Sequence, residues 1–140
     1  MRVFENSFIY FIQGETTGLI KIGKTNGGVE ERMTNLQTGS PDFLRIIGVT
    51  FEPYSNEYGL HCLFSQYRKH GEWFMPSEEI IEYIEKNCFK NVQTAYSAYY
   101  EIKNSSITYE VAIKMDESKL LEILNDLNKK RIERALNVAQ

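Results

Sequence analysis

Three side chains that can exchange a proton or bind an anion fall close together in one helical stretch of the sequence. Glu57, His61 and Arg68 lie within about 40° of one another at a helical step of about 100° per residue. They flank an apolar sector made of Leu60, Leu63, Phe64 and Tyr67. A histidine at this place can transfer protons or contact a phosphate, and it can equally be a satisfied structural residue. Because Glu57 and His61 are also spaced as an exposed helix pair, the spacing leaves both interpretations open.

The elements that must position these side chains begin with a β-hairpin. Ser7–Gln13 and Leu19–Ile22 are β-branched and aromatic runs, and the residues between them start and end with glycine. From Gly27 the pattern changes to helical spacing, with apolar residues at positions 29, 33 and 36, and this helix should stop near Thr38–Pro41. Phe43–Phe51 then predicts a third strand. Pro53, Ser55 and Asn56 mark the start of the helix that carries the three polar residues.

The remainder of the chain continues with helices and one more strand. Gly71–Phe74 brings two aromatic residues towards the core; Phe74 is expected inside it, whereas Trp73 either packs there or stacks on a base. A helix begins at Pro76–Glu79, and a boundary follows near Asn87–Asn91. Beyond the boundary, the pattern predicts a tyrosine-rich helix, an alternating strand over residues 107–113 and a long helix from about Asp116.

The order of these elements predicts an α+β fold in two parts. Residues 1–88 would form a small antiparallel three-stranded sheet flanked by helices. Residues 89–140 would form a C-terminal α/β extension that ends in the long helix. That helix carries a wide apolar stripe, which packs on the chain's own strand 107–113 or joins two copies in a homodimer through residues 90–140.

Composition limits the class of protein. A chain of 140 residues with 42% hydrophobic residues can bury a core without disulfides or structural metal. No apolar run approaches the roughly 20 residues that cross a bilayer, and Glu5 stands where a signal peptide has basic residues, so we expect a soluble cytoplasmic protein. The net charge of −3 argues against a surface that coats nucleic acid, but it leaves room for a small basic site. Cys62 and Cys88 lack the paired spacing of zinc or redox sites and are expected to be small, buried free thiols.

Five segments of the chain together resemble a known nuclease superfamily. Phe8-Ile9-Tyr10-Phe11-Ile12, then Lys21-Ile22-Gly23, then Arg32 in the following helix resemble the GIY-YIG nucleases. More narrowly, LIKIGKT, RMTNLQTGSP, a helix with Glu57 and His61, and GEWF resemble the branch named after the phage T5 orf172 domain, also called the meiotically up-regulated gene 113 domain. The resemblance covers about residues 7–85, and the last fifty or so residues match no family.

The resemblance implies cleavage of phosphodiester bonds with one divalent cation, Mg²⁺ or Mn²⁺. It places Tyr10 near the attacking water as a general base or positioning group, and Arg32 on the scissile phosphate, which a planar guanidinium suits. Glu57 corresponds to the carboxylate that binds the metal, a hard oxygen ligand of the kind Mg²⁺ prefers. His61 supports proton transfer or phosphate contact. Lys24 and Arg68 are expected to bind phosphates together with Arg32.

The chain departs from the family pattern at two positions. Lys21 stands where the wider superfamily has a second tyrosine, and it would hold a phosphate as a point charge or, with a suitable environment, act as a base. Phe8 replaces the first glycine of the motif, which changes packing more than chemistry. The family's late asparagine has no clear counterpart.

These observations predict a metal-dependent endonuclease that acts on DNA, with RNA as the other substrate the fold allows. Two alternatives belong to other classes: a nucleic-acid-binding or protein-interaction module without turnover, and an oligomerising element in residues 90–140 for which the nuclease-like part is a scaffold. A phage or mobile element, a defence system and a repair pathway would all suit this fold, because a fold does not fix its biological setting.

Overall fold

The fold is centred on one antiparallel sheet. A computed structural model describes residues 6–104 and 107–114, and, in the C-terminal segment, 122, 125–126, 129–130 and 132–137. The sheet has five strands in the order β3-β1-β2-β5-β4, with every described pairing antiparallel. The strands are β1 (Phe8–Gly14), β2 (Ile20–Thr25), β3 (Leu44–Phe51), β4 (Arg68–His70) and β5 (Trp73–Phe74).

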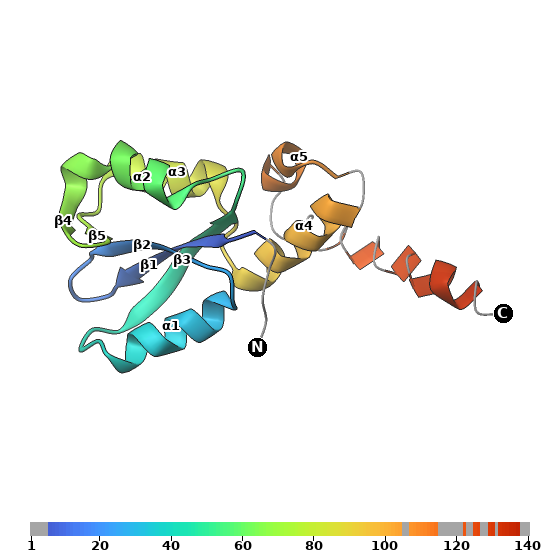
Figure 1. Cartoon of the computed structure of the whole chain (residues 1–140), viewed down its shortest axis with the longest axis horizontal. Helices are drawn as coiled ribbons and strands as arrows, with labels where there is room; N and C mark the ends of the chain where they lie inside the picture. The colour runs from blue at the N-terminus through green and yellow to red at the C-terminus, as the bar shows by residue number, and fades with distance from the viewer. Residues whose placement is uncertain are drawn as a thin grey trace.

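Helices cover both faces of this sheet. In Figure 1, α1 lies on one side of the strands, α2 and α3 lie on the other, and α4 and α5 stand at the end away from β4 and β5. The helices within the described residues are α1 (Val29–Thr38), α2 (Glu57–Leu63), the short 3₁₀ turn η1 (Ser65–Tyr67), α3 (Glu78–Asn87), α4 (Val92–Asn104) and α5 (Tyr109–Lys114). Two of them start at side-chain caps, since Asn56 accepts from Gly59 N and Ser77 accepts from Ile80 N.

Alternation along β1 divides the core into two clusters. Residues on one face of β1 join α1, α4 and α5 in what we call the first core, whose buried members are Phe8, Tyr10, Ile12, Val29, Leu44, Val49, Phe51, Phe89, Ala95, Tyr96, Ala98, Tyr99, Tyr109 and Ala112. Residues on the other face join α2 and α3 in the second core, made of Ile9, Phe11, Ile20, Ile22, Leu60, Phe64, Phe74, Ile80, Ile84 and Cys88. β1 is therefore buried on both sides, which fits its nearly continuous apolar sequence.

The hairpin, the third strand and the helices at 29–38, 57–63 and 78–87 confirm the predicted elements, but the predicted three-stranded sheet is too small. The segment around GEWF adds β5, which pairs with β2 through Ile20–Phe74 and Lys21–Trp73. β4 then pairs with β5. Strands of two or three residues are too short to show an alternating pattern in the sequence.

The second helix is shorter than its apolar sector predicts. It ends at Leu63, and the chain continues through η1 into β4, so Arg68 lies on a strand rather than on the helix with His61. Leu63 is 59% exposed instead of packing with Leu60. The prediction that Arg68 lies on the same helix as His61 is thus wrong, although the Arg68 guanidinium still reaches the His61 ring.

The predicted strand over residues 107–113 is also wrong, because Tyr109–Lys114 is helix α5. Tyr109 and Ala112, one helical turn apart, are buried, whereas Val111 is 46% exposed. The start of the predicted long helix near Asp116, with most of its apolar stripe, lies outside the described residues; residues 132–137 are helical and exposed. The homodimer through residues 90–140 and the division at residue 88 stay predictions.

Two smaller expectations have clear outcomes. Cys62 and Cys88 are both free thiols as predicted; Cys88 is buried, which raises its pKa, but Cys62 is exposed. Among the described residues, no helix combines the length and the apolar character needed to cross a bilayer.

Candidate functional site

The centre of the candidate site is a contact between β1 and α1. Tyr10 is 1% exposed and lies in the first core, and its hydroxyl accepts a hydrogen bond from Arg32 Nε at 3.3 Å. This bond is the main reason why the pKa of Arg32 is raised. With Nε directed at Tyr10, the terminal nitrogens of the exposed Arg32 guanidinium remain available to an anion. Two residues that the sequence placed in the site, 22 positions apart, thus meet directly.

Gly23 makes room for this tyrosine. It faces Tyr10 in the register of β1 and β2. A Cβ atom built on Gly23 would meet Tyr10 Cζ at 2.5 Å, far inside any real carbon contact. The glycine of the Lys21-Ile22-Gly23 motif therefore lets the tyrosine ring lie directly against the backbone of β2.

Lys21 lies on the same face of the sheet as Tyr10, one pair further along. It faces Ile12 in β1, and Ile12 and Tyr10 share a face because they are two residues apart. Lys21 is buried, and its ammonium forms an ion pair with Glu72 Oε2 at 2.8 Å. It also lies 5.7 Å from the centre of the Trp73 ring. This charge-assisted hydrogen bond fixes the position of the Lys21 ammonium.

Glu72 is a site residue that the sequence interpretation missed. It lies in the turn before β5, holds Lys21, and also raises the pKa of Arg32 through its negative charge. Its place in the GEWF segment was the only available signal, because nothing local indicates a partner 51 positions away. Of the neighbouring aromatics, Phe74 is fully buried and Trp73 packs against the first core, which makes both structural.

His61 and Arg68 form a second group at the edge of β2. His61 Nε2 lies 2.8 Å from the carbonyl oxygen of Ile22, which can only accept, so Nε2 carries the proton. Arg68 Nη2 lies 3.3 Å from Nδ1 and donates to it. The Arg68 guanidinium also lies 5.6 Å from the centre of the Phe74 ring. Both nitrogens of the His61 ring are thus hydrogen bonded, and one of them holds Arg68.

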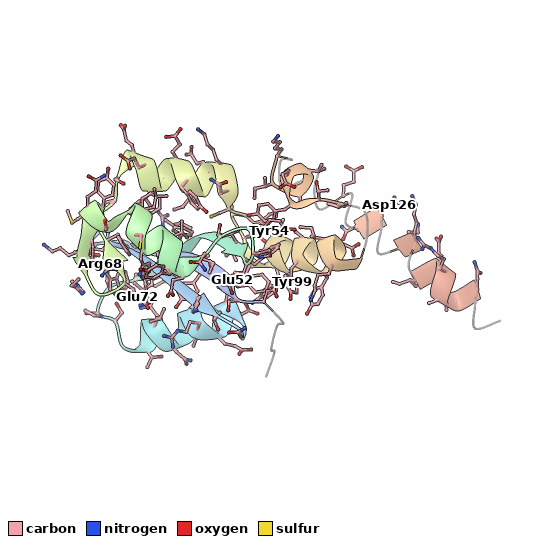
Figure 2. The ribbon with its side chains drawn as sticks, turned by 45° about the horizontal axis from the view of Figure 1, so that its top comes forward. Glu52, Tyr54, Arg68, Glu72, Tyr99 and Asp126 are labelled. Carbon is pink, nitrogen blue, oxygen red and sulfur yellow. The ribbon has the colours of Figure 1, made fainter. Side chains whose placement is uncertain are left out.

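Arg68 is therefore an anchored cation. Within the described part of the chain, no carboxylate lies at ion-pair distance from it. Its neighbours Tyr58, Cys62 and Ser65 line a shallow pocket with it and His61. Figure 2 shows Arg68 and Glu72 at the same end of the molecule, away from α4 and α5. Lys24 is the second-last residue of β2, the strand that also carries Lys21, and it is exposed.

Glu57 offers an unpaired carboxylate one helical turn before His61. It is the first residue of α2 and is half-buried, and within the described residues its carboxylate makes no hydrogen bond or ion pair. No group of three acidic, histidine or cysteine side chains that could hold a metal occurs among those residues. A single carboxylate fits Mg²⁺ or Mn²⁺ bound mainly by water and substrate oxygens, because Mg²⁺ keeps several of its waters.

Not all of these predicted residues touch one another. Tyr10 bonds Arg32, and His61 bonds Arg68, while Glu57 and Lys24 form no hydrogen bond or ion pair with the other predicted site residues. The two groups come together at β2, because His61 binds the carbonyl of Ile22, which lies between Lys21 and Gly23. β2 is thus the strand that the two groups share, with Lys21 on the face that joins the first core, whereas α2, which carries Glu57, packs in the second core on the other face.

Tyr10 on β1, Gly23 on β2 and Arg32 on α1 thus follow the order of the motif by which the sequence resembles the GIY-YIG nucleases. The model of the T5orf172 domain family matches residues 7–88. The chain belongs to the T5orf172 domain family, whose domain is GIY-YIG-like, as the sequence resemblance indicated. No curated protein and no solved structure matches the chain.

Proposed function

We propose that this protein is a divalent-metal-dependent endonuclease that hydrolyses phosphodiester bonds in DNA. Membership of a GIY-YIG-like family supports a nuclease and a nucleic-acid partner. The observation that carries the proposal is the hydrogen bond between Arg32 Nε and the Tyr10 hydroxyl, because it joins the phosphate-binding and water-positioning residues in one unit.

The roles of this chain's residues follow from their donors and acceptors. Arg32 binds the scissile phosphate through its terminal nitrogens, where negative charge grows in the transition state. The Tyr10 oxygen, which already accepts from Arg32, retains its O–H and a second lone pair to hold the attacking water. The water oxygen bonds to phosphorus as the phosphorus–oxygen bond to the leaving group breaks. The water's proton leaves through Tyr10 or solvent, and the leaving oxygen takes a proton from solvent.

Lys21 acts in this proposal as a fixed cation rather than as a base. Its ion pair with Glu72 holds the ammonium in place, and the ammonium can add its field to the phosphate site. Arg68 and Lys24 bind flanking phosphates of the same strand. Because the net charge of the chain is −3, such local cations would have to supply most of the attraction to DNA.

Glu57 would hold the metal ion. A bound Mg²⁺ or Mn²⁺ supplies Lewis-acid stabilisation of the phosphate and a water of lowered pKa. The carboxylate at the start of α2 is suited to this because it is half-buried and makes no ion pair among the described residues.

The test is cleavage of supercoiled plasmid DNA with Mg²⁺, with Mn²⁺ and with chelator. Glu57→Ala and Arg32→Ala should each lower the cleavage rate at least about 100-fold, the scale for losing one group that stabilises the transition state. Glu78→Ala is the matched control for Glu57, since Glu78 is the first residue of α3 behind a similar side-chain cap. Arg45→Ala, on β3, is the control for Arg32.

The outcomes separate the classes of function. Metal-dependent nicking that survives in both controls and is lost in both site variants supports the endonuclease. Activity that survives Glu57→Ala and Arg32→Ala refutes the assigned site. A folded parent that binds DNA without cutting plasmid, branched DNA or RNA would instead identify a binding module.

A further inference from the structure

The segment beyond the family domain reaches the helix that carries Arg32. Tyr96 lies on α4, 67 positions after Val29, and is 5% exposed. Its hydroxyl accepts a hydrogen bond from Val29 N at 2.7 Å and donates one to Glu30 Oε2 at 2.6 Å. Both partners belong to the first turn of α1.

This contact supplies a cap that α1 lacks in its own sequence. The N-cap residue is Gly28, which has no side chain to accept from the first amides of the helix. By contrast, α2 and α3 have local side-chain caps. A buried amide without an acceptor is costly, and here the Tyr96 hydroxyl takes that place. The first turn of α1, with Arg32 N bonded to Gly28 O, is thus completed by a residue from α4.

A departure from the family motif supports the same contact. Phe8 stands where the motif has its first glycine and is fully buried. The Tyr96 ring meets Phe8 edge to face with centroids 5.1 Å apart, and Tyr99 lies at the same distance on a tilted ring. Phe8 is two residues from Tyr10 on the same face of β1. Hence α4 rests on the start of the strand that carries Tyr10 and caps the helix that carries Arg32.

We infer that Tyr96 is a positioning residue for the proposed nuclease site and that α4 is part of the catalytic unit, although it lies outside the family domain. Tyr96 fixes the start of α1 and thereby the direction in which Arg32 meets Tyr10. This inference rests on the proposed function for its effect on cleavage, while the effect on Arg32 itself can be measured without any activity.

The experiment compares Tyr96→Phe with Tyr109→Phe in the full chain. Tyr109 is a matched control, because its hydroxyl is also buried and bonds Thr50 Oγ1 at 2.6 Å and the Asn87 carbonyl, yet it makes no hydrogen bond to α1. Hydrogen exchange and ¹⁵N spectra should show loss of protection at the Arg32 amide and Nε–H in Tyr96→Phe only. Its kcat for cleavage should fall about ten-fold below that of Tyr109→Phe with little change in KM, since misplacing a catalytic group costs rate on this scale.

A second pair of variants keeps the test valid if Tyr96→Phe does not fold. Glu30→Gln weakens the bond from the Tyr96 hydroxyl, and Glu31→Gln removes the same charge from the same helical turn without touching Tyr96. Glu30→Gln should change the Arg32 signals and the rate more than Glu31→Gln.

Equal Arg32 signals and equal rates within each pair would overturn the inference and leave Tyr96 as a core residue only. If the parent protein does not cleave at all, the proposed function fails. In that case the Arg32 signals alone decide whether Tyr96 positions α1.

Discussion

The ammonium of Lys21 and the carboxylate of Glu72 lie 2.8 Å apart and join β2 to the turn before β5. The lysine side chain is 11% exposed and the glutamate 40%, so the pair lies partly out of water. Removal of one partner leaves a largely buried charge behind. The ion pair therefore links the charge of Lys21 in the site to the pairing of β2 with β5.

Glu72→Gln should therefore destabilise the protein by about 1–2 kcal/mol, between the values for exposed and for buried pairs. The measurement is urea unfolding. Glu82→Gln is the control, because the Glu82–Lys86 pair is exposed and should contribute little to stability. Equal losses of stability in the two variants would show that the Lys21–Glu72 pair stabilises the fold no more than the exposed pair does.

Gly23→Ala should disturb both the fold and the site. The added methyl group would strike the Tyr10 ring, and overpacking of this kind costs about 1–3 kcal/mol. Cleavage should fall with it, because Tyr10 must move away from Arg32. Thermal unfolding and plasmid cleavage test this, with Gly39→Ala as control, since a Cβ there meets no atom closer than 4.0 Å and should change stability by less than about 0.5 kcal/mol. A stable and active Gly23→Ala protein would contradict the packing described.

His61 should act through Arg68 rather than in proton transfer, since both of its ring nitrogens are hydrogen bonded. We expect His61→Ala and Arg68→Ala each to weaken DNA binding by roughly five-fold, about 1 kcal/mol, and the double variant to be no weaker than either. Fluorescence anisotropy with a short duplex measures this. Lys69→Ala, which removes an exposed neighbouring charge, should be additive with His61→Ala. Additive losses of DNA affinity would show that His61 contributes to binding independently of Arg68. A fall in kcat that His61→Ala still causes in the Arg68→Ala background would point to an independent catalytic role.

Asp42 should make the stability depend on acid pH. Its carboxylate accepts from the amides of Thr16 and Thr17, and these hydrogen bonds lower its pKa from 3.8 to about 2. Because the folded-state pKa is depressed, the contribution is complete above the unfolded value of 3.8 and is lost as the pH falls to about 2. The melting temperatures of the parent and Asp42→Asn should thus differ above about pH 5 and converge near pH 2. A difference that stays constant over this range would refute the assignment.

Local sequence patterns determined the hairpin, α1, β3 and α3. These elements have turn residues, caps or apolar spacing that act over a few residues, such as Ser77 before α3. The family resemblance placed Tyr10 and Arg32 in one site without predicting that they touch, and the structure shows a hydrogen bond between them. The catalytic roles of Tyr10, Lys21, Arg32, Glu57 and His61 remain predictions.

Tertiary structure alone decided the remaining features, because their partners are far apart in the sequence. The alternating segment at residues 107–113 fits a strand and a helix equally well over so short a run. It is helical where Tyr109 stacks on Tyr54 at 4.1 Å and hydrogen bonds Thr50. β4 and β5 exist through pairing that begins at β2. Likewise, no local pattern predicts that Glu72 binds Lys21 or that Tyr96 caps α1. These partners are 51 and 67 positions apart in the sequence, so their contacts depend on how the sheet and the helices pack.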